Sequence, residues 1–272
     1  MERRVMTHKS KSSLFALAML AGLTGEPSGA PAGDRARLTV VFDNVAYRKD
    51  LKTSWGFSCL VETGGKTILF DTGNSARTLL SNMKALSLDP GKVDAVVLSH
   101  NHGDHTGGLE GFLAQSPRAA VYAPASFPRA FWKALKARSV EARPTAEPTT
   151  LFPGVHTTGE MGRSLVEQGL VVETSRGPVL LTGCAHPGIE NMARQVARRF
   201  PGGIHLLMGG FHLMNHSRRE LEGLCRELRD LGVRRVAPSH CTGDEARRIF
   251  KETWGEDFVE SGAGAVIEAG EP

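Results

Sequence analysis

The sequence predicts an α+β fold in which two mixed β-sheets are flanked by helices. Short β-rich runs alternate with helical patterns from residue 38 onward, and the strands outnumber those that a simple doubly wound fold would use. Several strands arrive as pairs joined by turn residues, which is typical of hairpins and favours mixed sheets over purely parallel ones. With 272 residues, 40% of them hydrophobic, and a net charge of +4, the chain can bury a full core and is not predominantly disordered.

The first half of the chain opens with a hairpin and leads to a buried strand. The stretch 63–66, Thr-Gly-Gly-Lys, separates two β-rich runs and predicts a tight turn between them. The apolar run at 93–98 predicts a buried strand that continues directly into His100. In chain order, we expect strands at 38–42, 57–61 and 67–70, an amphipathic helix at 75–86, and the strand at 93–98.

The second half alternates strands with helices. No internal repeat with a period of about 20 to 50 residues is evident, so the pattern does not predict a solenoid or a propeller. The helical stretches carry the amphipathic spacing of helices that cover one face of a sheet. We expect strands at 119–122, 170–174, 179–182, 204–208, 235–238 and 265–268, and helices at 127–137, 188–199, 218–231 and 243–253.

Residues 1–32 have the pattern of a secretory signal peptide followed by a linker. Four basic side chains within the first 13 residues precede an apolar run at 14–23, which is about half the length of a membrane-spanning helix. Ala30-Pro31-Ala32 offers a small-x-small cleavage site. The alternative is a disordered tail with a fortuitous apolar patch. We therefore expect an exported, periplasmic protein whose mature domain spans 33–272 and which is not stably inserted in the membrane once the signal is removed.

Charge and cysteine content exclude several classes of protein. Beyond residue 32 the chain carries 29 basic and 27 acidic side chains, and no basic stripe with interleaved aromatic residues is present. No nucleic-acid partner is therefore expected, and the expected ligand is a small-molecule substrate. The four cysteines are too few and too scattered for a disulfide-stapled mini-fold or a CxxC zinc ribbon.

The strongest functional signal directly follows the strand expected at 93–98. His100, His102, Asp104 and His105 fall within six positions. In an extended chain the two imidazoles of His100 and His102 point to the same side, because side chains repeat every two residues. A turn at Gly103 then lets Asp104 and His105 face the same cavity. Neutral imidazoles and a carboxylate are the ligands that zinc and similar divalent metals prefer, so the motif predicts a metal site rather than a polar surface loop.

Three more histidines stand just after predicted strands. His186, His212 and His240 each lie beside glycine-bearing turns, where a rigid strand fixes a side chain and glycine permits close backbone approach. Each one alone is also compatible with a structural histidine, but together the motifs supply six histidines and an aspartate, enough for two metal ions. Asp71 also ends a strand. It either orients a ligand imidazole or caps the helix beginning near Ser75, and the two roles are compatible.

With these motifs the chain resembles the metallo-β-lactamase superfamily, whose His-x-His-x-Asp-His signature is matched at His100, His102, Asp104 and His105. The resemblance covers about residues 38–269. The segments at 68–73, 182–189, 209–213 and 238–243 are similar to the branch named after dihydropterin-ribofuranosylaminobenzene phosphate synthase. This resemblance implies an αββα sandwich with two divalent metal ions, zinc in most members and manganese or iron in some, at the rim between the sheets.

The resemblance also implies how the ligands are divided. His100, His102 and His186 would hold the first ion, and Asp104, His105 and His240 the second. The sequence departs from the commoner family pattern at the aspartate that bridges the two ions, because Cys184 follows the corresponding strand. Cys184, His186 and His212 are the candidates for the bridging ligand, and a mononuclear site stays open.

The function favoured by these motifs is an exported hydrolase in which a metal-bound hydroxide attacks an ester, phosphoester, lactone or amide. Asp104 would hold the second metal and orient the hydroxide. His212 would protonate the leaving group, or alternatively it would only make a hydrogen bond that fixes the turn at Gly209 and Gly210. One alternative is the transferase reaction of the synthase branch, against which the export signal argues. Another is a non-catalytic metal or ligand binder, against which the complete ligand set argues.

Overall fold

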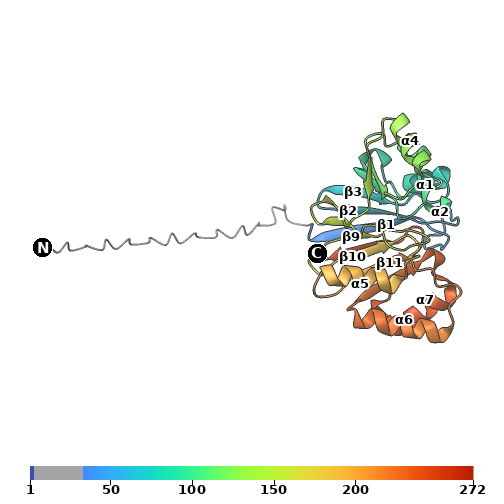
Figure 1. The fold of residues 1–272 in the computed structure, drawn as a ribbon. Coiled ribbons are helices and arrows are strands. Elements are labelled where there is room, and N and C mark those ends of the chain that lie inside the picture. Colours follow the sequence, from blue (N-terminus) through green and yellow to red (C-terminus); the bar gives the residue numbers. More distant parts are fainter. Residues whose placement is uncertain (3–32, 272) are drawn as a thin grey trace.

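The computed structural model describes residues 1–2 and 33–271, in which two mixed β-sheets lie face to face between two layers of helices (Figure 1). The αββα sandwich that the resemblance implied is therefore confirmed. The predicted signal peptide lies almost entirely outside the described residues. Within the described part of the chain, no helix combines the length and the apolar character needed to cross a membrane.

The first sheet has seven strands in the order β13-β1-β2-β3-β4-β5-β6. The four strands from β13 to β3 pair antiparallel, whereas β3, β4, β5 and β6 pair in parallel, so the sheet is mixed. The strands are β1 (Arg35–Phe42), β2 (Ser58–Thr63), β3 (Lys66–Phe70), β4 (Ala95–Val97), β5 (Ala120–Pro124), β6 (Ala142–Thr145) and β13 (Val266–Gly270).

The second sheet has six strands in the order β12-β11-β10-β9-β8-β7. Its β10, β11 and β12 are parallel, so their carboxyl ends meet at one edge of the sandwich, while the other pairings are antiparallel. The strands are β7 (Thr150–Phe152), β8 (Val155–Thr157), β9 (Leu170–Val172), β10 (Val179–Thr182), β11 (Leu206–Gly210) and β12 (Arg235–Ser239).

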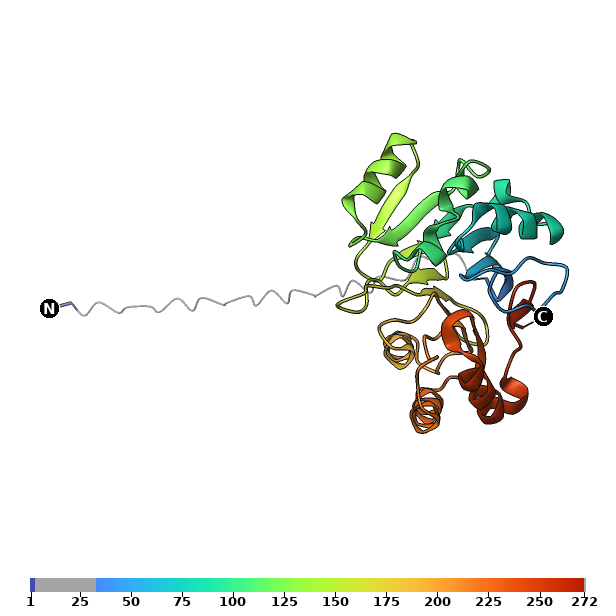
Figure 2. The same cartoon turned by 90° about the vertical axis from the view of Figure 1, so that its right-hand side faces the viewer.

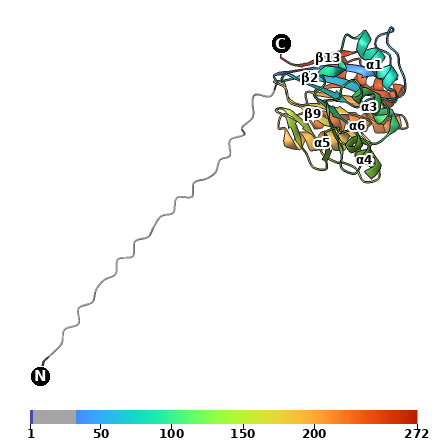
Figure 3. The ribbon, with the colours of Figure 1, turned by 90° about the horizontal axis from the view of Figure 1, so that it is seen from above.

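Helices cover the outer face of each sheet. The helices α1, α3 and α4 pack on the first sheet and lie toward the viewer in Figure 3, whereas α5, α6 and α7 pack on the second. The helices are α1 (Ala76–Ala85), α2 (Gly103–Thr106), α3 (Leu109–Leu113), α4 (Arg129–Ala137), α5 (Ile189–Arg199), α6 (Arg218–Asp230) and α7 (Asp244–Trp254), with 3₁₀ turns η1 (Pro90–Lys92), η2 (His240–Thr242) and η3 (Gly255–Asp257).

Three apolar layers hold the sandwich together. The central one fills the space between the sheets, with side chains such as Phe57 and Phe70 from one sheet against Leu181 and Met208 from the other. The two outer layers lie between each sheet and its helices. Because both faces of each central strand are covered, these strands read as continuous apolar runs, which is why the sequence located them well.

Three strands were not expected from the sequence: β6, β7 and β8. They are three or four residues long, and β6 and β7 are the edge strands of their sheets. An edge strand tolerates proline and exposed polar residues, as at Pro144 within β6, so it lacks the apolar pattern of a central strand. The sequence pattern therefore missed the edge strands β6 and β7, and it also missed the three-residue strand β8 that pairs with β7.

Candidate metal centre

The candidate ligands gather at the end of the sandwich where the parallel strands stop, the end that faces the viewer in Figure 2. His100 follows β4 of the first sheet, and Cys184, His212 and His240 follow β10, β11 and β12 of the second. The backbone is left-handed at Asp71, Ala185, His212 and His240, with φ between 51° and 57°. This conformation costs on the order of 1–3 kcal/mol at a non-glycine residue, so its concentration here indicates a functional site.

The first ligand group contains three imidazoles, and the thiol of Cys184 also belongs to it. Nε2 of His100 lies 3.1 Å from Nδ1 of His102, and the ring of His186 lies 4.8 and 5.1 Å from the rings of His100 and His102. Ser99 Oγ lies 2.9 Å from Nδ1 of His100, so the other nitrogen of that ring faces the group. Nε2 of His186 is buried and has no hydrogen-bond partner among the described residues. A cation between the three rings would give this nitrogen a partner.

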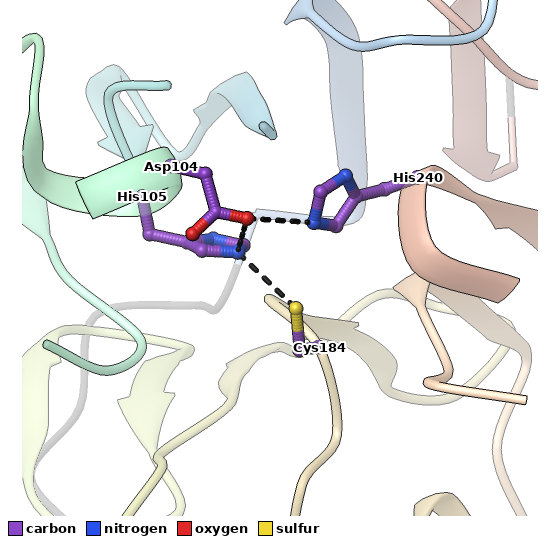
Figure 4. A group of neighbouring side chains, drawn as sticks. All are labelled: Asp104, His105, Cys184 and His240. Atoms are coloured by element: carbon purple, nitrogen blue, oxygen red, sulfur yellow. Dashed lines mark hydrogen bonds and ion pairs between the residues drawn. The ribbon is translucent and has the colours of Figure 1, made fainter. Parts of the chain in front are cut away.

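The second ligand group combines a carboxylate, two imidazoles and a thiol (Figure 4). Oδ2 of Asp104 lies 3.6 Å from Nε2 of His105 and 3.4 Å from Nε2 of His240. Sγ of Cys184 lies 3.2 Å from Nε2 of His105. One ligand atom of each of the four residues lies within 4.8 Å of the others, which is close enough for them to surround a single ion.

Hydrogen bonds to the far nitrogens fix how the imidazoles of the second group point. Nδ1 of His105 donates to Oδ2 of Asp71 at 2.7 Å, and Nδ1 of His240 lies 2.8 Å from Oδ1 of Asn44. Asp71 is itself held by the backbone N–H and the hydroxyl of Ser99, both at 2.7 Å. Asp71 thus orients a ligand imidazole, the first of its two expected roles, whereas Ser75 caps α1. Neither the position nor the type of Asn44 signalled its contact with His240.

Glu167 supports the site and carries no motif in the sequence. Its Oε1 accepts the backbone N–H groups of Gly183, Cys184 and Ala185 at 2.9–3.0 Å, and its Oε2 accepts that of His186 at 2.9 Å. Burial raises the pKa of this carboxyl, and the donated N–H bonds oppose that shift. One buried side chain therefore holds the segment that bears both Cys184 and His186. An isolated glutamate ahead of a strand gives no sequence signal of this role.

Cys184 belongs to both ligand groups. Its Sγ lies within 4.8 Å of one nitrogen of His100 and one of His186, as well as within 4.8 Å of the second group. Of the other two candidates for a bridging ligand, His186 lies with the first group and not with the second, and His212 lies in a separate group with Cys184 and Cys241. Among the three candidates, Cys184 is thus the residue whose position fits a bridge.

The pKa shifts of His100, His186 and Asp104 favour the protonation states that metal ligands require. Burial, and then the neighbouring imidazoles, lower the pKa of His100, and the same causes lower the pKa of His186 to about 4. Partial burial would raise the pKa of Asp104, but the hydrogen bond to His240 and the proximity of His105 outweigh it and lower that pKa. His100 and His186 are thus neutral and Asp104 is ionised at neutral pH, which fits a divalent cation. Burial would lower the pKa of His105, but the Asp71 carboxylate outweighs burial and raises that pKa, so a cation at His105 competes with a proton.

The structure brings all six sequence-predicted ligands together, and it places His212 at their edge. The ring of His212 is exposed and lies 4.4 Å from that of His186. Both rings line a cavity of about 490 Å³ between α5 and α6. The side of the site next to His240 is bordered by Trp55, whose ring is 5.0 Å away and which is 46% exposed. The cavity gives a substrate room on the side of the ligand groups that carries His186 and His212.

Comparison with known proteins agrees with this geometry. The family model described as the metallo-beta-lactamase superfamily matches residues 56–240. The chain is 30% identical over 283 aligned residues to 7,8-dihydropterin-6-methyl-4-(beta-D-ribofuranosyl)-aminobenzene-5'-phosphate synthase of Methanocaldococcus jannaschii, an alignment that covers 85% of this chain and 95% of that protein. It is also 25% identical over 261 residues to an uncharacterized protein of the same organism, covering 85% and 99% of the two chains.

A solved structure is similar as well. A crystal structure described as a metal-dependent hydrolase of the beta-lactamase superfamily superposes with a TM-score of 0.72 at 28% identity. The superposition covers 87% of this chain and all of that one. The sequence relative and the structural relative are thus described by different reactions, one a synthase and the other a hydrolase.

Proposed function

The chain belongs to the metallo-β-lactamase superfamily, and from this premise we propose that it is a metal-dependent hydrolase of esters, phosphoesters, lactones or amides. The observation that carries the proposal is the pair of ligand groups that meet at Cys184, because two adjacent cation sites suit hydrolysis. His100, His102 and His186 would hold one ion and Asp104, His105 and His240 the other, with Cys184 beside both sets of side chains. The nitrogen and sulfur donors favour zinc over magnesium or calcium, and manganese or iron are the alternatives.

A bound pair of divalent ions supplies a nucleophilic hydroxide at neutral pH and polarises the oxygen of the scissile group. Two side chains of the protein orient the water and move the proton. Asp104 is ionised, and an oxygen of its carboxylate accepts the hydrogen bond that orients the attacking water. The hydrogen bond with Cys241 raises the pKa of His212, which favours a protonated imidazole at the exposed edge of the site. His212 then donates that proton to the leaving group.

The lining of the cavity beside His186 and His212 bears on the choice between hydrolase and synthase. It contains Glu190, Glu220 and Glu227 and, among its lining residues, no lysine or arginine. A phosphate on a distant part of a substrate would find no cationic side chain there. The name of the Methanocaldococcus relative includes a 5'-phosphate, so this lining favours a different substrate. The identity of 30% to that relative keeps the transferase reaction as the second candidate.

Metal analysis combined with a substrate panel tests the proposal. Protein starting at Gly33 should contain two zinc or manganese ions per chain and should hydrolyse members of a phosphodiester and lactone panel. Chelation should abolish this activity and added zinc should restore it, since His186 has a buried nitrogen without a hydrogen-bond partner among the described residues. His102→Ala and Cys184→Ser should each lower the metal content, whereas His216→Ala, a cavity residue outside both groups, should not.

Two results would contradict the hydrolase proposal. One is a metal-replete protein that is inert on the whole panel but condenses a pterin with a phosphorylated arylamine riboside, which would establish the transferase. The other is a single iron, or no metal, in active protein, which would remove the two-ion mechanism.

We also propose that the protein acts outside the cytoplasm. The support is the order of basic and apolar residues in 1–32. Expression of the full chain in a Gram-negative host should yield a periplasmic protein shortened near Ala32, and deletion of 3–32 should leave it in the cytoplasm. Full-length protein in the cytoplasmic fraction, with Met1 intact, would contradict export.

A further inference from the structure

Three adjacent parallel strands of the second sheet present a second kind of ligand set. Cys184, His212 and Cys241 are each the second residue beyond the end of their strand, after β10, β11 and β12 respectively. The three strands are parallel, with Thr182 paired to Gly209 and Gly210 to Ser239, so the segments just beyond their carboxyl ends lie side by side. This places two sulfur atoms and one imidazole together at the rim of the sandwich.

The three ligand atoms are close enough to share one ion. One ligand atom of each residue lies within 4.8 Å of those of the other two. Both cysteines are buried, and Sγ of Cys241 lies 3.8 Å from the backbone oxygen of Cys184. The imidazole of His212 is exposed, so a cation has a route in from solvent.

The absence of a side chain at Gly210 allows Cys241 to approach the end of β11 closely. A Cβ added at Gly210 would lie 2.7 Å from Sγ of Cys241 and 2.3 Å from the backbone oxygen of Gly183. Any other residue at this position would therefore displace Cys241 or the strand end beside it. The glycine that ends β11 keeps the three ligands adjacent.

We propose that Cys184, His212 and Cys241 form an additional metal-binding position, selective for a thiophilic cation such as zinc, cadmium or copper(I). Two thiolates and one imidazole are a softer donor set than the imidazoles and carboxylate that surround the proposed two-ion centre. The additional position adjoins that centre, because Cys184 contributes to all three groups. A fourth ligand would come from solvent, because the side chain of His212 is exposed.

An ion at this position also has a consequence for catalysis, which rests on the proposed function. A cation bound there would be ligated by the imidazole nitrogen of His212 that otherwise gives its proton to the leaving group. Excess cadmium should then inhibit hydrolysis by the wild-type protein and should inhibit Cys241→Ser less.

Cadmium titration of the reduced protein tests the additional position without any substrate. Wild-type protein starting at Gly33 should bind one more cadmium ion per chain than Cys241→Ser, measured by equilibrium dialysis and elemental analysis. The ultraviolet thiolate-to-cadmium charge-transfer absorption should fall in Cys241→Ser as well, because the number of cadmium–sulfur bonds falls. Cys225→Ser removes a buried thiol of α6 outside these groups and serves as the matched control, with binding equal to wild type.

His212→Ala gives an independent reading, because the exposed side chain is removed without disturbing the core. It should also lose one cadmium ion. Equal stoichiometry and equal charge-transfer absorption in wild type, Cys241→Ser and His212→Ala would overturn the proposal. This test measures the difference in bound cadmium between wild type and each variant, and it uses neither the total metal content nor turnover. An inert protein, or one with a single ion at the other ligands, would refute the hydrolase proposal. The cadmium comparison would still decide whether the additional position exists.

Discussion

Asp104→Ala is expected to lower kcat/KM for hydrolysis by at least about 10³-fold, since it removes both a proposed metal ligand and the group proposed to orient the attacking water. Oδ2 of Asp104 lies between Nε2 of His105 and Nε2 of His240, at 3.6 and 3.4 Å. Without that oxygen the second ion keeps only two imidazoles and the Cys184 sulfur. Elemental analysis should show its loss, with one ion fewer per chain than in wild type.

The fold should survive the Asp104→Ala change. Asp104 lies in the short helix α2 at the rim of the sandwich, and its side chain is 19% exposed. The chelated variant should therefore unfold in urea within about 1 kcal/mol of chelated wild type, as is usual for substitutions outside the core. Glu110→Ala, which removes an exposed carboxylate in the nearby α3, is the matched control and should retain both metal and activity. An active, metal-replete Asp104→Ala protein would refute the role assigned to this residue.

The candidate ligands could be predicted from the sequence because each lies in a short motif next to an apolar run that predicts a strand. His100, His102, Asp104 and His105 sit within six positions after an apolar strand, and a chain that turns at Gly103 has few ways to separate them. The three later histidines follow β10, β11 and β12, which are parallel neighbours in the second sheet. The position of each ligand therefore follows from a strand end, and strand ends in the buried centre of a sheet are well marked by apolar runs.

The residues that support the ligands could not be predicted, because their roles depend on contacts between distant parts of the chain. Glu167 and Asn44 act across 19 and 196 positions, on His186 and His240 respectively. Neither stands in a motif, and a buried carboxylate that accepts backbone N–H groups looks like any other glutamate in the sequence. The position of Cys184 in both ligand groups likewise depends on how closely the two sheets approach, which no local pattern specifies.

Glu167→Gln is expected to lower the affinity for metal by about 10- to 100-fold, although Glu167 is not itself in any of the ligand groups. Its carboxylate accepts four backbone N–H groups from the segment that carries Cys184 and His186. A glutamine offers one acceptor oxygen. If that oxygen replaces Oε1, the amide NH₂ faces the N–H of His186, so two donors oppose each other inside the protein. The ligand segment must then move away from the position that the two groups require.

The same change should lower the free energy of unfolding by about 2 kcal/mol, since hydrogen bonds to a buried charge are lost and a buried donor is left without a partner. Urea unfolding of chelated protein measures this part separately from the metal, and zinc titration against a competing chelator measures the affinity. Glu160→Gln is the control: it makes the same chemical change where a single backbone N–H, that of Ser126, is accepted at the surface. Wild-type zinc affinity in Glu167→Gln would show that the Cys184–His186 segment holds its position without this carboxylate, and the ligands would then owe their arrangement to the strand ends alone.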